Sequence, residues 1–142
     1  MKNRLSAIEE LQKAVKLNPE YHEALNYLGY VYVEESRRLE EAEAMIRKAL
    51  ELDPENAAYI DSLGWLFFKK AKYQDAVAQL EKAASLLNDP VIFDHLGDAY
   101  LKIGNFEKSK EYWKKSLELK PDQPEIEEKI KTSEIVDGRQ GD

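Results

Sequence analysis

The stretch that decides the fold is residues 60–67, which read Ile-Asp-Ser-Leu-Gly-Trp-Leu-Phe. Its Leu-Gly dipeptide at 63–64 recurs at 28–29 and 96–97, so the copies are 35 and 33 residues apart. In every copy a large apolar residue lies three positions before the leucine, and an aromatic residue lies three positions after the glycine. These spacings place the side chains on one face of a helix. Glycine on that face lets a second helix come close, which explains its presence despite a helix-propensity cost of about 1 kcal/mol.

A second pattern follows each Leu-Gly stretch. It consists of a small residue, a large residue four positions later, a small residue three positions further on, and a proline five positions after that. The small residues admit close helix contact, and the proline ends the helix because it has no amide donor. The matching residues are Ala42, Ile46, Ala49 and Pro54; Ala76, Leu80 and Ala83, with Asn88 in place of proline; Ser109, Trp113, Ser116 and Pro121; and, with no Leu-Gly stretch before them, Ala7, Leu11, Ala14 and Pro19.

Together the two patterns resemble the tetratricopeptide repeat, a helix–turn–helix unit of about 34 residues. The resemblance implies an all-α, right-handed solenoid in a single domain over residues 1–135. We expect a half-repeat at 4–21, full repeats at 22–56, 57–89 and 90–123, and a polar capping helix at 124–134. Residues 136–142 are polar, and we expect them to form a disordered tail. The sequence also looks like the bacterial type of these proteins, which suggests a fragment of a longer chain.

Helix positions follow from the same periodicity and from the prolines between the helices. The lone first helix is expected at 4–17, and the last helix from Pro124 to about residue 133. The helices between them are expected at 22–35, 39–52, 57–70, 73–87, 90–103 and 106–119.

Composition excludes several classes of function. The chain has 142 residues with 21 basic and 28 acidic side chains, a net charge of −7, which disfavours nucleic-acid binding. It has no cysteine, so it contains neither disulfides nor thiolate metal sites. Its apolar runs are too short to span a membrane, so we expect no direct membrane insertion, and we expect no signal peptide within these residues. We expect a soluble protein and leave the compartment, cytoplasmic or periplasmic, open.

No constellation of catalytic residues is present, and we predict that the chain is not an enzyme. The two histidines, His22 and His95, lack a second histidine at metal-ligand spacing, so no metal site is predicted. His95 is expected in a partly exposed position as a solvated or packing residue. No motif for a cofactor is present either, so none is expected.

The resemblance places a partner-binding groove along the first helices of the repeats. The candidate groove residues share one helical face beside the Leu-Gly face. They are Asn26, Tyr30, Val33, Asp61, Trp65, Phe68, Asp94, Asp98 and Leu101. The aromatic residues among them suggest exposed binding anchors, and the acidic residues suggest a protein or peptide partner with apolar and basic groups. The alternative is that Trp65 and Phe68 are ordinary core.

One subset of the family binds the C-terminal carboxylate of chaperone peptides through lysine, arginine and asparagine side chains. The matching positions here hold Asn26 and Tyr30, then Ser62, then Val91 and His95. The cations are missing, so a carboxylate clamp and a heat-shock chaperone partner are not expected.

These observations favour a non-catalytic protein-interaction module. The alternatives are a structural spacer or self-association segment, and an auxiliary region of an enzyme. Burial of Trp65 would remove the central anchor and favour the spacer. The first helix lacks a partner helix before it, so we also predict weak self-association through the N-terminal half-repeat, at Leu5 and Leu11.

Overall fold

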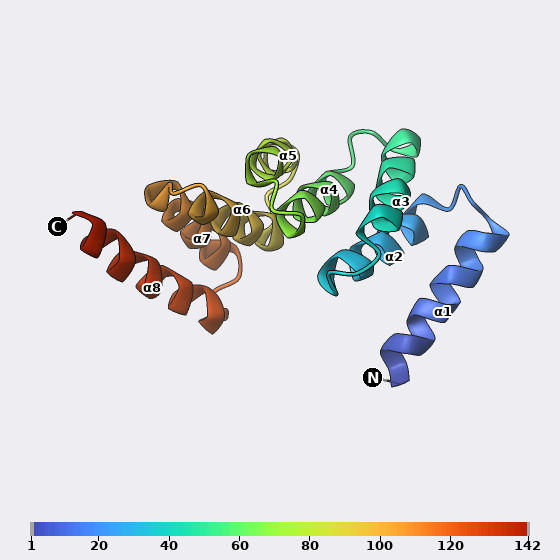
Figure 1. Ribbon diagram of the computed structural model, residues 1–142, viewed down its shortest axis with the longest axis horizontal. Coiled ribbons are helices and arrows are strands. Elements are labelled where there is room, and N and C mark those ends of the chain that lie inside the picture. The colour runs from blue at the N-terminus through green and yellow to red at the C-terminus, as the bar shows by residue number, and fades with distance from the viewer. Residues whose placement is uncertain (1, 142) are drawn as a thin grey trace.

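The computed structural model describes the backbone of residues 2–141 and the side chains of residues 5–136, and this part of the chain contains helices and no strand. All helices except α1 begin at the predicted residue. They are α1 (Lys2–Leu17), α2 (His22–Glu34), α3 (Leu39–Leu52), α4 (Ala57–Lys69), α5 (Tyr73–Leu86), α6 (Pro90–Lys102), α7 (Phe106–Leu119) and α8 (Pro124–Gly141). The helices follow one another along an elongated array with the two termini at opposite ends (Figure 1).

Local capping explains where the first helices of the later repeats begin. The Asp89 side chain accepts hydrogen bonds from the backbone N–H groups of Val91 and Ile92, and Pro90 takes the first helical position, where no amide donor is needed. Asn56 caps α4 in the same way, by accepting from the N–H of Tyr59 at 3.2 Å. These caps satisfy amides that the helix itself leaves without partners.

Within each repeat the two helices pack through the predicted glycine contact. A Cβ atom at Gly64 would lie 2.8 Å from Leu80 Cγ, and one at Gly29 would lie 2.9 Å from Ile46 Cγ1. At Gly97 the added atom would overlap the Trp113 ring. The prediction that glycine admits the second helix is therefore confirmed.

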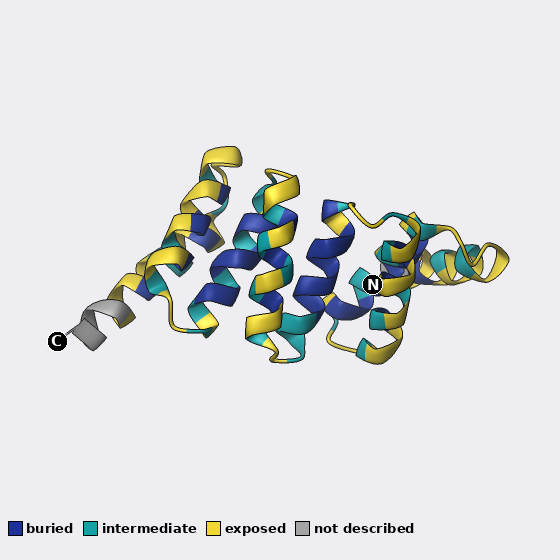
Figure 2. Cartoon of the chain, turned by 90° about the horizontal axis from the view of Figure 1, so that it is seen from above, coloured by how far each residue is buried: buried dark blue, intermediate teal, exposed yellow. Residues whose placement is uncertain are grey.

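The core runs along the array between successive helices, where Figure 2 shows the buried residues on facing sides. Leu28, Val33 and Leu66 are buried in one cluster that joins the first two full repeats. Each repeat thus buries its apolar face against its neighbours, as expected of a solenoid.

The turns inside the repeats use the left-handed backbone region. Gly104 has a φ of 85°, and Ala71, at the matching position of the second repeat, has a φ of 61°. In the first repeat, Ser36 and Arg38 have φ values of 52° and 51°. Non-glycine residues are strained in this region, so the backbone conformation of Ala71 lowers the stability of the fold by a modest amount.

Helix α8 is longer than the predicted cap, because its backbone continues to Gly141 instead of ending near residue 134. The expected tail at 136–142 is therefore helical as far as Gly141, and the side chains from 137 onward lie outside the described residues. As far as residue 136 the helix keeps contact with the rest of the array, because Ser133 is buried and both Ser133 and Val136 line a hollow with Trp113. The polar composition of the tail concealed this continuation.

Candidate partner-binding groove

The first helices of the repeats, α2, α4 and α6, bring the predicted groove residues onto one side of the array. They do not form one continuous strip. Two hollows take most of these residues, and a buried aromatic residue, Trp65, belongs to neither.

The first hollow, of about 300 Å³, lies where α2 and α4 meet the start of α6. Its walls combine exposed apolar residues from the end of α5 and the start of α6 with polar side chains of α2 and α4. The lining residues are Asn26, Tyr30, Ala58, Asp61, Ser62, Leu87, Asp89, Val91 and Ile92. The Asn26 Oδ1 atom is buried there without a hydrogen-bond partner among the described residues. The hollow contains acids and acceptors but no lysine or arginine in its lining.

The second hollow, of about 370 Å³, lies where α4 and α6 meet α8. Its wall is mostly apolar, with charged residues around it. The lining residues are Phe68, Asp98, Leu101, Lys102, Trp113, Glu125, Glu128, Lys129, Thr132, Ser133 and Val136. The cap helix is thus part of the groove, although it was not among the helices predicted to line it. The signal that could have found it is the apolar spacing of Ile126, Ile130 and Val136.

The interpretation of Trp65 as an exposed anchor is wrong, because its side chain is only 8% exposed. Its ring stacks on Phe68 at 4.4 Å and on His95 at 3.9 Å, measured between ring centroids. Val33 is fully buried as well and does not reach the groove surface. These two residues are core because the neighbouring repeat covers them.

His95 is also buried, in contrast to its expected partly exposed position. Its Nδ1 atom lies 2.8 Å from Asp61 Oδ1, so the two side chains join α6 to α4. Burial alone would lower the pKa of His95, but the Asp61 carboxylate and the nearby Asp94 and Asp98 raise it above its usual value. The contact with Asp61 therefore favours the protonated form of His95 between α4 and α6.

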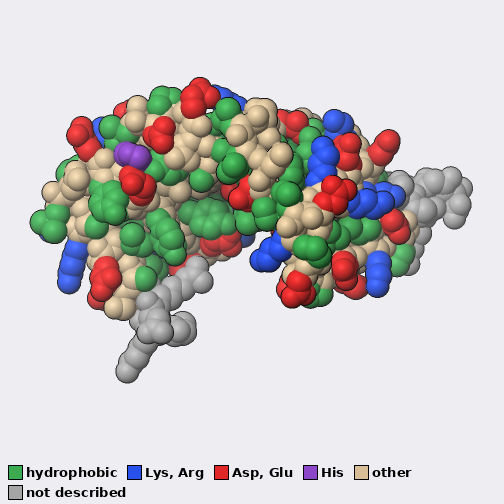
Figure 3. Space-filling model, turned by 180° about the vertical axis from the view of Figure 1, so that it is seen from behind, with side chains coloured by type: hydrophobic (Ala, Val, Ile, Leu, Met, Phe, Trp, Pro, Cys, Tyr) green, Lys and Arg blue, Asp and Glu red, His purple; other side chains and the backbone are tan. Residues whose placement is uncertain are grey.

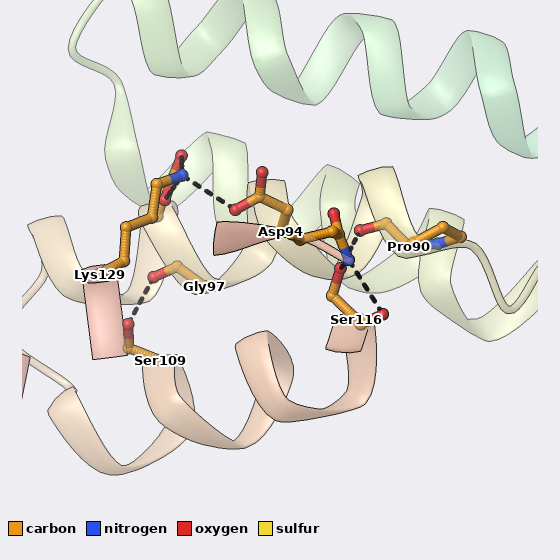
Figure 4. Close-up of polar contacts among 8 residues, drawn as sticks. Pro90, Asp94, Gly97, Ser109, Ser116 and Lys129 are labelled. Atoms are coloured by element: carbon orange, nitrogen blue, oxygen red, sulfur yellow. Dashed lines mark hydrogen bonds and ion pairs between the residues drawn. The ribbon is translucent and has the colours of Figure 1, made fainter. Parts of the chain in front are cut away.

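Lys129 connects α8 to α6, because it forms ion pairs with two aspartates that were predicted to line the groove. Its Nζ atom lies 3.0 Å from Asp94 Oδ1 and 2.9 Å from Asp98 Oδ1, and it reaches across to Asp94 in Figure 4. Burial raises the pKa of Asp98, and the adjacent Asp94 raises it further, while Lys129 opposes both effects. Both carboxylates are thus already paired with Lys129, and of the two only Asp98 lines a hollow.

Two classes of site are not found in the described part of the chain. No group of three or more histidine and acidic side chains there could hold a metal ion. None of the helices over residues 2–141 combines the length and apolar character needed to cross a bilayer.

The family model of the tetratricopeptide repeat protein 21 C-terminal ARM domain matches residues 1–133. The chain belongs to this family. A curated relative, the mitochondrial import receptor subunit TOM70 of Saccharomyces cerevisiae, is 38% identical over 60 residues. That match covers 42% of this chain but only 10% of the receptor, so the chain corresponds to a small part of that protein.

Solved structures share the family's fold. PilF of Pseudomonas aeruginosa superimposes with a TM-score of 0.78 at 26% identity, over 96% of this chain and 64% of PilF. The first repeat domain of Spaghetti (RPAP3), bound to the HSP90 peptide SRMEEVD, gives a TM-score of 0.74 at 20% identity, over 81% of this chain and 91% of that domain. The second likeness establishes the fold alone. The all-α solenoid predicted from the repeats is confirmed.

Proposed function

We propose that this chain is a non-catalytic interaction module that binds a peptide or a partner helix along α2, α4, α6 and α8. The observation that carries the proposal is the pair of hollows lined by residues of successive repeats. A ligand that spans repeats can use both hollows at once. The fold supports this use, since the similar domain of RPAP3 holds a peptide.

The chemistry of the two hollows suggests the ligand. Asp89 and the Asn26 Oδ1 acceptor line the first hollow beside the exposed apolar residues Leu87 and Val91, so a lysine or arginine suits it, with its stem on the apolar wall. The second hollow has Phe68 and Leu101 in its wall and suits an apolar anchor. We therefore propose a segment with basic and apolar residues. An acidic peptide or a nucleic acid would meet repulsion.

The burial of Trp65 supports the alternative that the chain is a structural spacer, because the groove lacks the exposed aromatic anchor that Trp65 was expected to provide. We still favour the interaction module over the spacer, because exposed residues line the two hollows. Weak self-association through α1 stays a prediction, supported by the exposed Leu5 side chain.

The test is a pull-down with the full chain and a double variant, Val91→Glu with Leu101→Glu. The matched control is Leu119→Glu, because Leu119 and Val91 are both 49% exposed and Leu119 lies on α7, outside both hollows. We expect proteins that bind the wild-type chain and the control to be lost from the double variant, with unchanged thermal midpoints. Equal capture by all three chains would favour the spacer.

A further inference from the structure

A basic side chain bridges neighbouring helices of the groove at two junctions. At the junction of α4 with α6, the sixth residue of α6, His95, pairs with the fifth residue of α4, Asp61. At the junction of α6 with α8, Lys129 is again the sixth residue of its helix. It pairs with Asp94 and Asp98, the fifth and ninth residues of α6, and Figure 4 shows its contact with Asp94. The same helical positions thus hold the base and its acid at both junctions.

The junction of α2 with α4 lacks such a bridge. The sixth residue of α4 is Ser62, whose hydroxyl donates to the Ala58 carbonyl oxygen of its own helix at 3.1 Å. The fifth residue of α2 is Asn26, whose Oδ1 atom is buried without a partner among the described residues. The first hollow lies at this junction, and Asn26, Ser62 and the ninth residue of α2, Tyr30, all line it. The hollow therefore occupies the place that a basic side chain fills at the other two junctions.

The surroundings of the first hollow favour a positive charge. Its lining contains aspartates but no lysine or arginine. Asp61 is paired with His95, so Asp89 and the Asn26 amide oxygen are the acceptors that a ligand would meet. Asp89 also accepts a hydrogen bond from the N–H of Val91 at 2.8 Å, and its charge offsets the positive end of α6, which would otherwise repel a cation.

The wall beside these acceptors is apolar and open to solvent. Leu87 and Val91 line the hollow and are 47% and 49% exposed. On the face seen in Figure 3, broad hydrophobic patches with acidic side chains between them cover the half of the molecule that carries the N-terminus, and α2 belongs to that half. The methylene stem of a lysine or arginine can lie on such a wall while its charged end reaches the buried oxygen.

We propose that the first hollow is a subsite for one lysine or arginine side chain of the bound segment, with its charged end between Asn26 and Ser62. This inference rests on the proposed function and adds to it the place in the groove at which the segment carries its basic residue. The bound cation would join α2 to α4 as Lys129 joins α6 to α8. The helices around the hollow all lie inside the array, so the site does not depend on α1.

The probe is n-butylammonium, which reproduces the end of a lysine side chain, and the comparison compound is n-butanol, which has the same shape without the charge. In a heteronuclear NMR titration of the full chain, we expect butylammonium to shift the side-chain amide signals of Asn26 with a dissociation constant on the order of millimolar. Butanol should shift them about fivefold less at equal concentration, because it cannot form a charge-assisted hydrogen bond. Equal shifts from the two compounds would overturn the proposal.

Variants of Asn26 test the acceptor directly. Asn26→Asp supplies the acid found at the same position of α4 and α6, so it should tighten butylammonium binding by about tenfold. Asn26→Leu keeps the size of the side chain but removes the acceptor, and it should weaken binding by about tenfold. The matched control is Asn105→Asp, which adds the same charge at the cap of α7, where aspartate caps as well as asparagine does. Equal binding by the wild type and Asn26→Leu would contradict the subsite, and so would equal binding by the two aspartate variants.

The chain can also be made to fill the hollow itself. Ser62→Lys combined with Asn26→Asp reproduces the arrangement of Lys129 and Asp94. The double variant should have a higher thermal midpoint than Asn26→Asp alone, and it should no longer bind butylammonium. Binding as tight as that of Asn26→Asp would place the probe elsewhere and overturn the proposal. If the buried lysine prevents folding, the single Asn26 variants still decide.

The pull-down separates this inference from the proposed function. Partners that are lost from Val91→Glu with Leu101→Glu but retained by a folded Asn26→Leu would leave the groove in place and overturn the subsite. Loss of the same partners from both variants, with unchanged thermal midpoints, would support it. Butylammonium binding at Asn26 in a chain that captures no partner would support the cation site and contradict the proposed function.

Discussion

His95 and Asp61 form a buried pair between the first helices of successive repeats, with Nδ1 of the histidine 2.8 Å from Oδ1 of the aspartate. The histidine ring also stacks on Trp65 at 3.9 Å. A protonated His95 therefore gains both an ion pair and a cation–π contact, and Trp65 is held in the core by the same arrangement. The contact between α4 and α6 thus depends on a group that titrates.

This pair predicts a pH dependence of stability. The folded-state pKa of His95 is raised, because the Asp61, Asp94 and Asp98 carboxylates outweigh the effect of burial. The stabilisation is therefore fully present below the unfolded-state pKa, about 6.5, and is lost as the pH rises through the folded-state pKa. Urea unfolding over this range should show a free energy of unfolding that falls with pH.

The two histidines provide the matched variants for that measurement. His95→Asn should flatten the dependence, whereas His22→Gln, which removes the other histidine, should keep it. An identical slope in the wild type and in His95→Asn would show that the pair does not carry the effect.

Overpacking tests the contact between paired helices. Ala83 is fully buried on α5, so Ala83→Leu should cost ~1–3 kcal/mol and lower the thermal midpoint. Lys82→Leu, on the exposed side of the same helix, is the control and should change little. Glu81 is unsuitable as a control because its carboxylate accepts a hydrogen bond from the Tyr100 hydroxyl at 2.9 Å. Equal losses from Ala83→Leu and Lys82→Leu would contradict the packing described.

The left-handed turns allow a pair of opposite substitutions. Ala71→Gly removes strain of ~1–2 kcal/mol at a φ of 61° but gives the unfolded chain more freedom, so we expect a net gain of about 0.5–1 kcal/mol. Gly104→Ala introduces the same strain at a φ of 85° and should cost about 1 kcal/mol or more. Denaturant unfolding measures both. Changes of the same sign would rule out strain as the cause.

The last prediction concerns the tie between the cap helix and α6. Lys129→Met keeps the side-chain stem but leaves Asp94 and Asp98 without their cation, so it should cost about 1 kcal/mol near pH 7, a modest value because the pair is partly exposed. Burial raises the pKa of Asp98, so the cost should shrink at acidic pH as this carboxylate becomes protonated. Lys131→Met, on the exposed side of α8, is the control. A cost that does not change with pH would point to lost packing instead of lost charge.

Three features were predictable from the sequence: the repeats, the starts of the helices after α1, and the glycine contacts. They depend on local rules: helical periodicity, capping and the need for a small residue where two backbones meet. Leu63-Gly64 opposite Leu80 is an example, because both partners lie within one repeat and their spacing along the chain sets their contact.

Only the tertiary structure decided which residues of the groove face are exposed. Tyr27, Ser62 and His95 hold matching positions, yet Tyr27 is open while the other two are covered by a preceding helix. Contacts between residues of different repeats are a second example. Trp65 is buried and stacks on His95, and Lys129 of the cap helix pairs with Asp98. Periodicity gives the face of a helix on which a residue lies, but the stacking of repeats determines whether another helix covers that face.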